Sequence, residues 1–131
     1  MLQRAGLALA VLLCLLGARN AANAIRQLSS DASFIEVQVQ RLRVLEPALP
    51  EHAVAGFLTD LPKGSDQETW ALYTTQYALA PRLVIPYPSS RRCDWVIGNF
   101  TQPVDLERIA RENKLRLIRD YDGGVVLFRP W

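Results

Sequence analysis

The chain has 131 residues, a length that suits a single domain, and a formal net charge of +2. Arg4 and Arg19 supply this excess, because the first 24 residues contain no acidic side chain and residues 25–131 hold 13 basic and 13 acidic ones. Proteins that bind nucleic acid usually carry a basic stripe that neutralises phosphates, so this charge balance argues against a nucleic-acid partner.

The N-terminus carries a membrane-targeting pattern. After a short positive start, residues 5–18 contain no polar side chain, and an Ala-Asn-Ala sequence ending at Ala24 offers a cleavage site. Arg19 lies between the two, which favours retention of residues 1–24 as a signal anchor over removal as a signal peptide. We expect residues 2–24 to contact a lipid bilayer in a single pass, with the following domain outside the cytoplasm. Cleavage near Ala24, with release of the domain on the far side of the membrane, is the alternative.

Residues 25–50 are predicted to form a connector and a stalk helix. Residues 25–33 are mostly polar and indicate the connector. Apolar residues then recur at near-helical spacing over residues 34–49, although the alternation over residues 37–40 leaves a strand possible. We interpret this segment as a helix that Pro47 and Pro50 end.

Residues 51–131 are predicted to form a small extracytoplasmic α/β domain. The pattern indicates a strand, a helix, two strands, a second helix and a closing hairpin, at residues 53–58, 66–80, 82–85, 94–98, 103–114, 115–119 and 125–129. This order predicts a Rossmann-like sheet of about five strands with two helices. The continuous apolar strands favour a sheet covered on both faces. Ser65 and Glu68 fit a capping box at the start of the first helix.

The first predicted helix of this domain carries an aromatic row. Trp70, Tyr73 and Tyr77 fall on one side of the helix, while two leucines and Gln76 fall on the other. A helix that is apolar on two sides is usually sandwiched between layers, so we expect structural packing, with a ligand platform as the alternative. Gln76 would need a hydrogen-bond partner if it is buried.

Polar side chains follow the predicted strands at their carboxyl ends, where open parallel sheets collect ligands. Asp60, Tyr87 and Asn99 hold these positions, and we expect Asp60 and Asn99 to make hydrogen bonds in turns. The chain contains no phosphate-binding loop, zinc motif or Ser-His-acid set, so no cofactor and no metal is expected. Cys93 is interpreted as a small buried thiol and not as a nucleophile.

Four segments resemble a family of small bacterial membrane-anchored proteins: L-T-D at 58–60, Q-Y-A-L-A-P-R-L-V at 76–84, D-W-V-I-G-N-F at 94–100 and D-G-G-V-V-L-F at 122–128. Similar segments accompany membrane glycosyltransferases of the protein-mannosyltransferase type. The resemblance implies an N-terminal anchor and an α/β domain in the envelope, but supplies no reaction. The residues to which it points as ligand or partner contacts are Asp60, Tyr73, Gln76, Tyr77, Arg82 and Asn99.

These features predict a non-catalytic accessory protein of the bacterial envelope. Its expected partner is a membrane glycosyltransferase, another polysaccharide-assembly protein, or the glycan-lipid substrate of the transferase. The alternative is a small envelope hydrolase or transferase that uses Asp60 with Tyr77 or Arg82. A third possibility is an assembly module that dimerises through the stalk helix, over residues 34–45.

Overall fold

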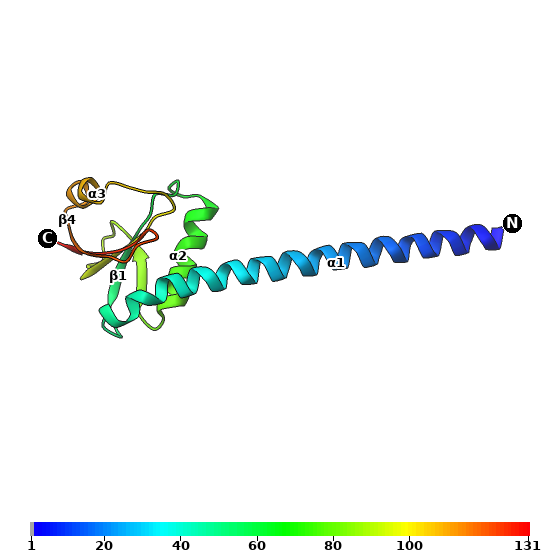
Figure 1. Cartoon of the computed structure of the whole chain (residues 1–131), viewed down its shortest axis with the longest axis horizontal. Coiled ribbons are helices and arrows are strands. Elements are labelled where there is room, and N and C mark those ends of the chain that lie inside the picture. The colour runs from blue at the N-terminus through cyan, green and yellow to red at the C-terminus, as the bar shows by residue number, and fades with distance from the viewer. Residues whose placement is uncertain (1) are drawn as a thin grey trace. The chain divides into compact units, whose positions relative to one another are not determined.

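The computed structural model describes the backbone of residues 2–131 and the side chains outside residues 1–14, 28, 31 and 32. Within the described backbone the chain is an α/β protein with four helices and a five-stranded mixed sheet, which confirms the predicted class (Figure 1). It divides into two units, residues 1–36 and residues 37–131. In chain order the elements are α1 (Leu2–Leu42), η1 (Arg43–Ala48), β1 (Val54–Leu58), α2 (Asp66–Leu79), β2 (Leu83–Pro86), β3 (Trp95–Asn99), α3 (Leu106–Glu112), β4 (Leu115–Asp120) and β5 (Val125–Pro130).

Helix α1 is continuous, so the connector predicted at residues 25–33 is wrong: that segment is helical. It contains neither glycine nor proline, and the Ser29 hydroxyl donates to the Arg26 carbonyl at 2.9 Å inside the helix. Polar residues without such breakers can extend a helix that has already formed. In the part of the chain whose side chains are described, no helix combines the length and apolarity that crossing a bilayer requires. Most of the apolar run at residues 5–18 lies outside those residues.

The end of α1 belongs to the α/β unit. Val39, Leu42, Leu45 and Leu49 are all buried there. The unit therefore begins at residue 37 and not at residue 51, where composition placed the start of the domain. Beyond Leu42 the chain tightens into the 3-10 helix η1, in which side chains three residues apart lie above one another. This tightening keeps successive leucines on the same buried side.

The strands lie in the order β2-β1-β3-β5-β4. β1 pairs in parallel with β2 and β3, whereas β5 pairs antiparallel with β3 and β4. Helix α2 makes the crossover between β1 and β2, and a loop without a helix connects β2 to β3. The predicted closing hairpin is confirmed. Asp122, Gly123 and Gly124 form its turn with positive φ angles of 66°, 57° and 81°, a conformation that favours glycine.

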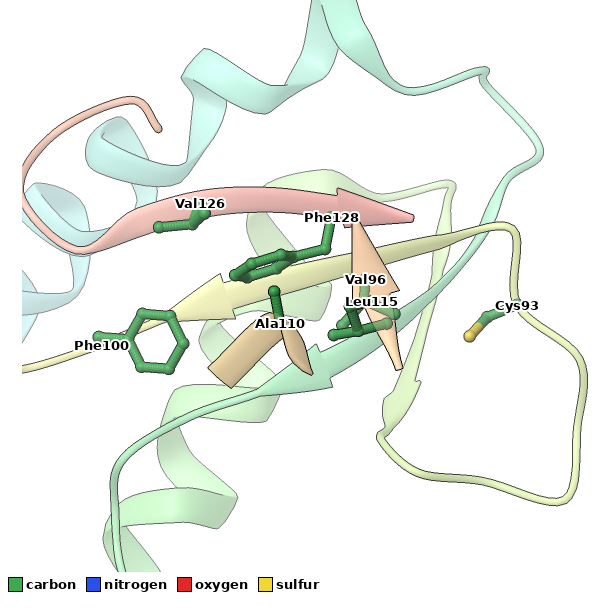
Figure 2. Packing of buried hydrophobic residues seen from close by; sticks show 7 residues of the cluster. All are labelled: Cys93, Val96, Phe100, Ala110, Leu115, Val126 and Phe128. Atoms are coloured by element: carbon green, nitrogen blue, oxygen red, sulfur yellow. The ribbon is translucent and has the colours of Figure 1, made fainter. Parts of the chain in front are cut away.

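Both faces of the sheet are covered, as the apolar strands predicted. On one face a cluster joins strands β3, β4 and β5 to helix α3, and Cys93 lies at the opposite end of it from Phe100 (Figure 2). Strand residues alternate between faces, so Ala55, Phe57 and Ile97 point to the other side, and all three are buried. Burial of each large apolar side chain contributes about 1.5–3 kcal/mol to stability.

The prediction that α2 is sandwiched between two layers is wrong. Thr75, Ala78 and Leu79 are buried, but Trp70, Tyr73 and Tyr77 are 59%, 66% and 73% exposed. Only one side of the helix lies against the domain, and small residues supply much of that side. The aromatic row therefore faces solvent.

The predicted N-terminal cap of α2 is confirmed, because the Ser65 hydroxyl accepts from the Glu68 amide at 3.1 Å. The reciprocal bond differs from a standard capping box. The Glu68 carboxylate accepts from the Gly64 amide, while the Ser65 amide donates to the Pro62 carbonyl at 3.1 Å.

Candidate functional site

Asp60 lies just beyond the carboxyl end of β1 and ties two loops together. One carboxylate oxygen accepts from the Thr101 amide at 2.8 Å, and the other accepts from the Thr101 hydroxyl at 2.9 Å and the Gln102 amide at 3.1 Å. Partial burial raises the pKa of Asp60, but these hydrogen bonds outweigh it, so the net pKa is lowered. Asp60 therefore makes structural hydrogen bonds, as expected, but they join it to a loop 41 and 42 residues further along the chain and not to its own turn.

Arg82 holds the end of the α1–η1 segment against the loop after α2. Its guanidinium donates to the Leu49 carbonyl at 3.1 and 3.0 Å and to the Glu46 carbonyl at 3.0 Å. Carbonyl groups at the end of a helix have no partner within the helix, and a cation is well suited to satisfy them. The contacts of Arg82 are therefore those of a structural residue.

Gln76 joins α2 to the edge strand β2. Its amide nitrogen donates to the Arg82 carbonyl at 2.7 Å, and its amide oxygen accepts from the Val84 amide at 2.7 Å. These two main-chain groups flank Leu83, whose own amide donates to Ala53 on the side of β1. Gln76 thus occupies the outer hydrogen-bonding edge of β2, a place where an exposed strand could otherwise pair with another chain.

Asp60 and Arg82 lie at opposite ends of two neighbouring parallel strands. Asp60 follows the carboxyl end of β1, whereas Arg82 precedes the amino end of β2. β1 has 5 residues, so roughly 15 Å separates the two ends. Tyr77 lies in the last turn of α2, which leads to Arg82 and away from Asp60. The structure does not bring together Asp60 with Arg82 or Tyr77.

The positions of Asn99 and Cys93 indicate structural roles. Asn99 lies within β3 opposite Val125 of β5 and is 6% exposed, so it is part of the sheet and not of the turn that was predicted. Burial raises the pKa of the Cys93 thiol, and the charge of Asp94 raises it further, which disfavours the reactive thiolate. Tyr87 packs against Gly56 and donates to the Asn113 carbonyl at 3.1 Å.

Arg41 was not singled out by the sequence, yet it connects α1 to the sheet. Its guanidinium donates to the Phe100 carbonyl at 3.0 Å and to Gln38 at 2.9 Å. Burial lowers the pKa of Arg41, and the charge of Asp60 opposes that shift. Only the tertiary contact identifies this residue, because a lone arginine on a helix is usually solvated.

The aromatic row, Trp70, Tyr73 and Tyr77, is the strongest candidate for a binding surface. Beside it lies an open hollow of about 370 Å³, lined by Asp66, Thr69, Trp70 and Tyr73. Contiguous exposed aromatic side chains are uncommon on monomeric proteins and mark contact sites. Trp and Tyr suit such sites because each combines a large apolar ring with a polar group. The sequence predicted that the three rings share one side of the helix. Whether they are exposed depends on whether another segment of the chain packs against that side.

Residues that could hold a metal ion do not gather in the described part of the chain, where no group of three or more His, Cys, Asp or Glu occurs. Comparison of the chain with family models, curated proteins and solved structures gives no match in any of the three.

Proposed function

We propose that this chain is a non-catalytic accessory protein of the bacterial envelope that binds its partner through the aromatic row of α2. The expected partner is a membrane glycosyltransferase or the glycan-lipid substrate of that enzyme. Residues 2–24 would anchor the chain in the inner membrane and hold the α/β unit outside the cytoplasm. The targeting pattern of the N-terminus supports the anchor. The α2 crossover between β1 and β2 supports a Rossmann-like reading of the parallel half of the sheet.

The observation that carries this proposal is the exposure of Trp70, Tyr73 and Tyr77 at 59–73% on one helix. Leaving three large rings in water forgoes the stabilisation that their burial would contribute, about 1.5–3 kcal/mol each. A second surface that covers the rings would recover part of that free energy. Trp and Tyr are also the residues most often found at the energetic centre of protein interfaces.

The polar residues support binding over catalysis by their existing contacts. Asp60, Gln76 and Arg82 each use their polar atoms on main-chain groups of the fold. A general acid, base or nucleophile must instead reach the reacting atoms of a substrate. The aromatic row has no such structural duty, and a partner can contact it without disturbing the sheet.

The test is affinity capture of the tagged full-length chain from native membranes, after mild crosslinking. The wild type and a triple variant, Trp70→Ala/Tyr73→Ala/Tyr77→Ala, are compared at matched expression. We expect the wild type to recover a membrane glycosyltransferase or a glycan-lipid, and the triple variant to lose at least nine-tenths of it, since several hot-spot rings are removed at once.

Gln67→Ala is the matched control, because Gln67 is exposed on the same helix but lies outside the aromatic row. It should capture the partner as the wild type does. Equal recovery by the triple variant would overturn the proposed contact surface. Recovery of the wild-type chain from the cytosol would overturn the anchored location.

A further inference from the structure

The aromatic rings of this chain differ in whether a cation covers them. The Arg129 guanidinium lies 4.4 Å from the centroid of the Trp95 ring, and the Arg119 guanidinium lies 5.0 Å from that of Tyr121. Among the described residues these are the two cation–π pairs, and neither includes a ring of α2. The aromatic row therefore presents π faces that could each accept a cation from outside the chain.

The charge on α2 also favours a cation. The helix contains Asp66 and Glu68 in its first turn and no lysine or arginine anywhere along its length. Glu68 accepts from the Gly64 amide, whereas Asp66 lines the hollow beside Trp70 and Tyr73 and forms no ion pair within the described chain. A carboxylate beside two electron-rich ring faces is complementary to a positively charged group.

The same surface is poorly suited to an anionic lipid headgroup or a phosphate, which the Asp66 carboxylate would repel. It also lacks the basic residues of a helix that inserts into a membrane surface. Such helices carry Lys and Arg on their polar face, opposite an apolar face of Trp, Phe or Leu. Helix α2 contains neither Lys nor Arg.

We propose that the hollow beside the aromatic row receives an arginine side chain from a basic segment of a partner protein. The inference rests on the proposed function. Of the two partners proposed there, it selects the membrane glycosyltransferase over the glycan-lipid. A planar guanidinium can stack on Trp70 and at the same time form paired hydrogen bonds with the Asp66 carboxylate. Tyr73 and Tyr77 follow at about 4.5 Å and 10.5 Å along the helix axis from Trp70, so a neighbouring basic residue could contact the same row.

The experiment titrates the full-length chain in detergent micelles with matched short peptides in a Gly-Ser background. One peptide carries two arginines, and the other carries two glutamines at the same positions. The readout is the Trp70 indole N–H resonance, assigned by its loss in Trp70→Phe. We expect the arginine peptide to shift this resonance saturably, and the glutamine peptide to leave it in place.

Asp66→Asn should weaken binding of the arginine peptide about three- to tenfold, because it removes the charge but keeps the size of the side chain. Gln67→Ala should bind as the wild type does. Equal shifts from the two peptides, or unchanged affinity in Asp66→Asn, would overturn the arginine proposal. A shift caused by a neutral oligosaccharide such as maltotriose, without one from the arginine peptide, would assign the row to a glycan instead.

The two proposals fail in different ways. If membrane capture is lost in the triple aromatic variant but undiminished in Asp66→Asn, the binding surface stands and the arginine contact is wrong. If capture survives in the triple variant, the proposed function itself is wrong.

Discussion

The polar residues at the ends of the sheet and the aromatic row of α2 represent opposite uses of chemically capable side chains. Asp60, Gln76 and Arg82 have the functional groups expected of an active site, yet each is bonded to the main chain of the fold. Trp70 and Tyr73 resemble core residues in the sequence, yet they face solvent. Residue type is enough to identify a candidate, whereas the contacts of each side chain distinguish structural residues from binding residues.

The physical reason for the difference is that polar groups need hydrogen-bond partners and aromatic rings do not. A polar group removed from water destabilises the protein unless it finds a hydrogen-bond partner, and the fold supplies partners for the half-buried Gln76 and Arg82. Asp60 is exposed, but it is bonded to Thr101 and Gln102. An exposed ring leaves no hydrogen bond unmade, and a folded domain can present it. Substitutions should therefore reduce stability more at the polar residues than in the aromatic row. Partner binding should show the reverse order.

The largest loss of stability is expected for Arg82→Ala. It removes the donors to the carbonyls of Glu46 and Leu49, and should lower the free energy of unfolding by about 2–3 kcal/mol. Denaturant unfolding measures this, with the exposed Arg91→Ala as the control. A fully stable Arg82→Ala variant that has lost function would instead support the alternative of an envelope enzyme.

Gln76→Leu should lower the free energy of unfolding by about 2 kcal/mol, because it leaves the Arg82 carbonyl and the Val84 amide without their 2.7 Å partners. Hydrogen exchange at the Val84 amide should accelerate with this loss. Gln67→Ala, on the solvent side of the same helix, should change neither quantity. An unchanged exchange rate in Gln76→Leu would show that Gln76 does not protect the edge of β2.

Asp60→Asn should lower the free energy of unfolding by about 1 kcal/mol at neutral pH. This is less than the loss of a buried hydrogen bond to a charged group would give, because Asp60 is exposed. The variant places an amide N–H against the donors of Thr101 or Gln102. The folded pKa of Asp60 is lowered from 3.8, so its carboxylate stabilises the fold above that pH. This contribution is lost as the pH falls below 3.8 through the folded pKa.

Thermal unfolding of the wild type and Asp60→Asn across this pH range provides the measurement. The difference in stability between them should be constant near neutral pH and shrink in acid. A difference that grows on acidification would contradict the assigned direction of the pKa shift.

The smallest effect on stability is expected for the triple variant Trp70→Ala/Tyr73→Ala/Tyr77→Ala. Exposed substitutions usually change stability by less than about 0.5 kcal/mol, and alanine favours helix. Circular dichroism and denaturant unfolding should show a native domain. A loss of several kcal/mol would mean that the rings pack within the fold, which would remove the contrast with the polar residues.

Local signals predicted much of the α/β unit correctly. Ser65 and Glu68 marked the start of α2, and the Asp-Gly-Gly sequence marked the turn between β4 and β5. These features follow from hydrogen bonds and backbone angles within a few residues. The helix at residues 25–33 does not follow from polarity, which indicates a loop; only the absence of a residue that ends a helix indicates it.

The sequence was sufficient to predict the order of β1 to β5 with α2 and α3, the hairpin and the aromatic row, because periodicity, capping and turn residues act over short distances. The tertiary structure alone decided that Arg82 reaches Leu49, that Gln76 protects β2 and that the aromatic row faces solvent. Each of these outcomes depends on which segments, distant along the chain, lie against one another. The sequence of a helix with two apolar sides does not specify which side will pack against the domain. In α2 that side contains small residues, and the large rings remain exposed.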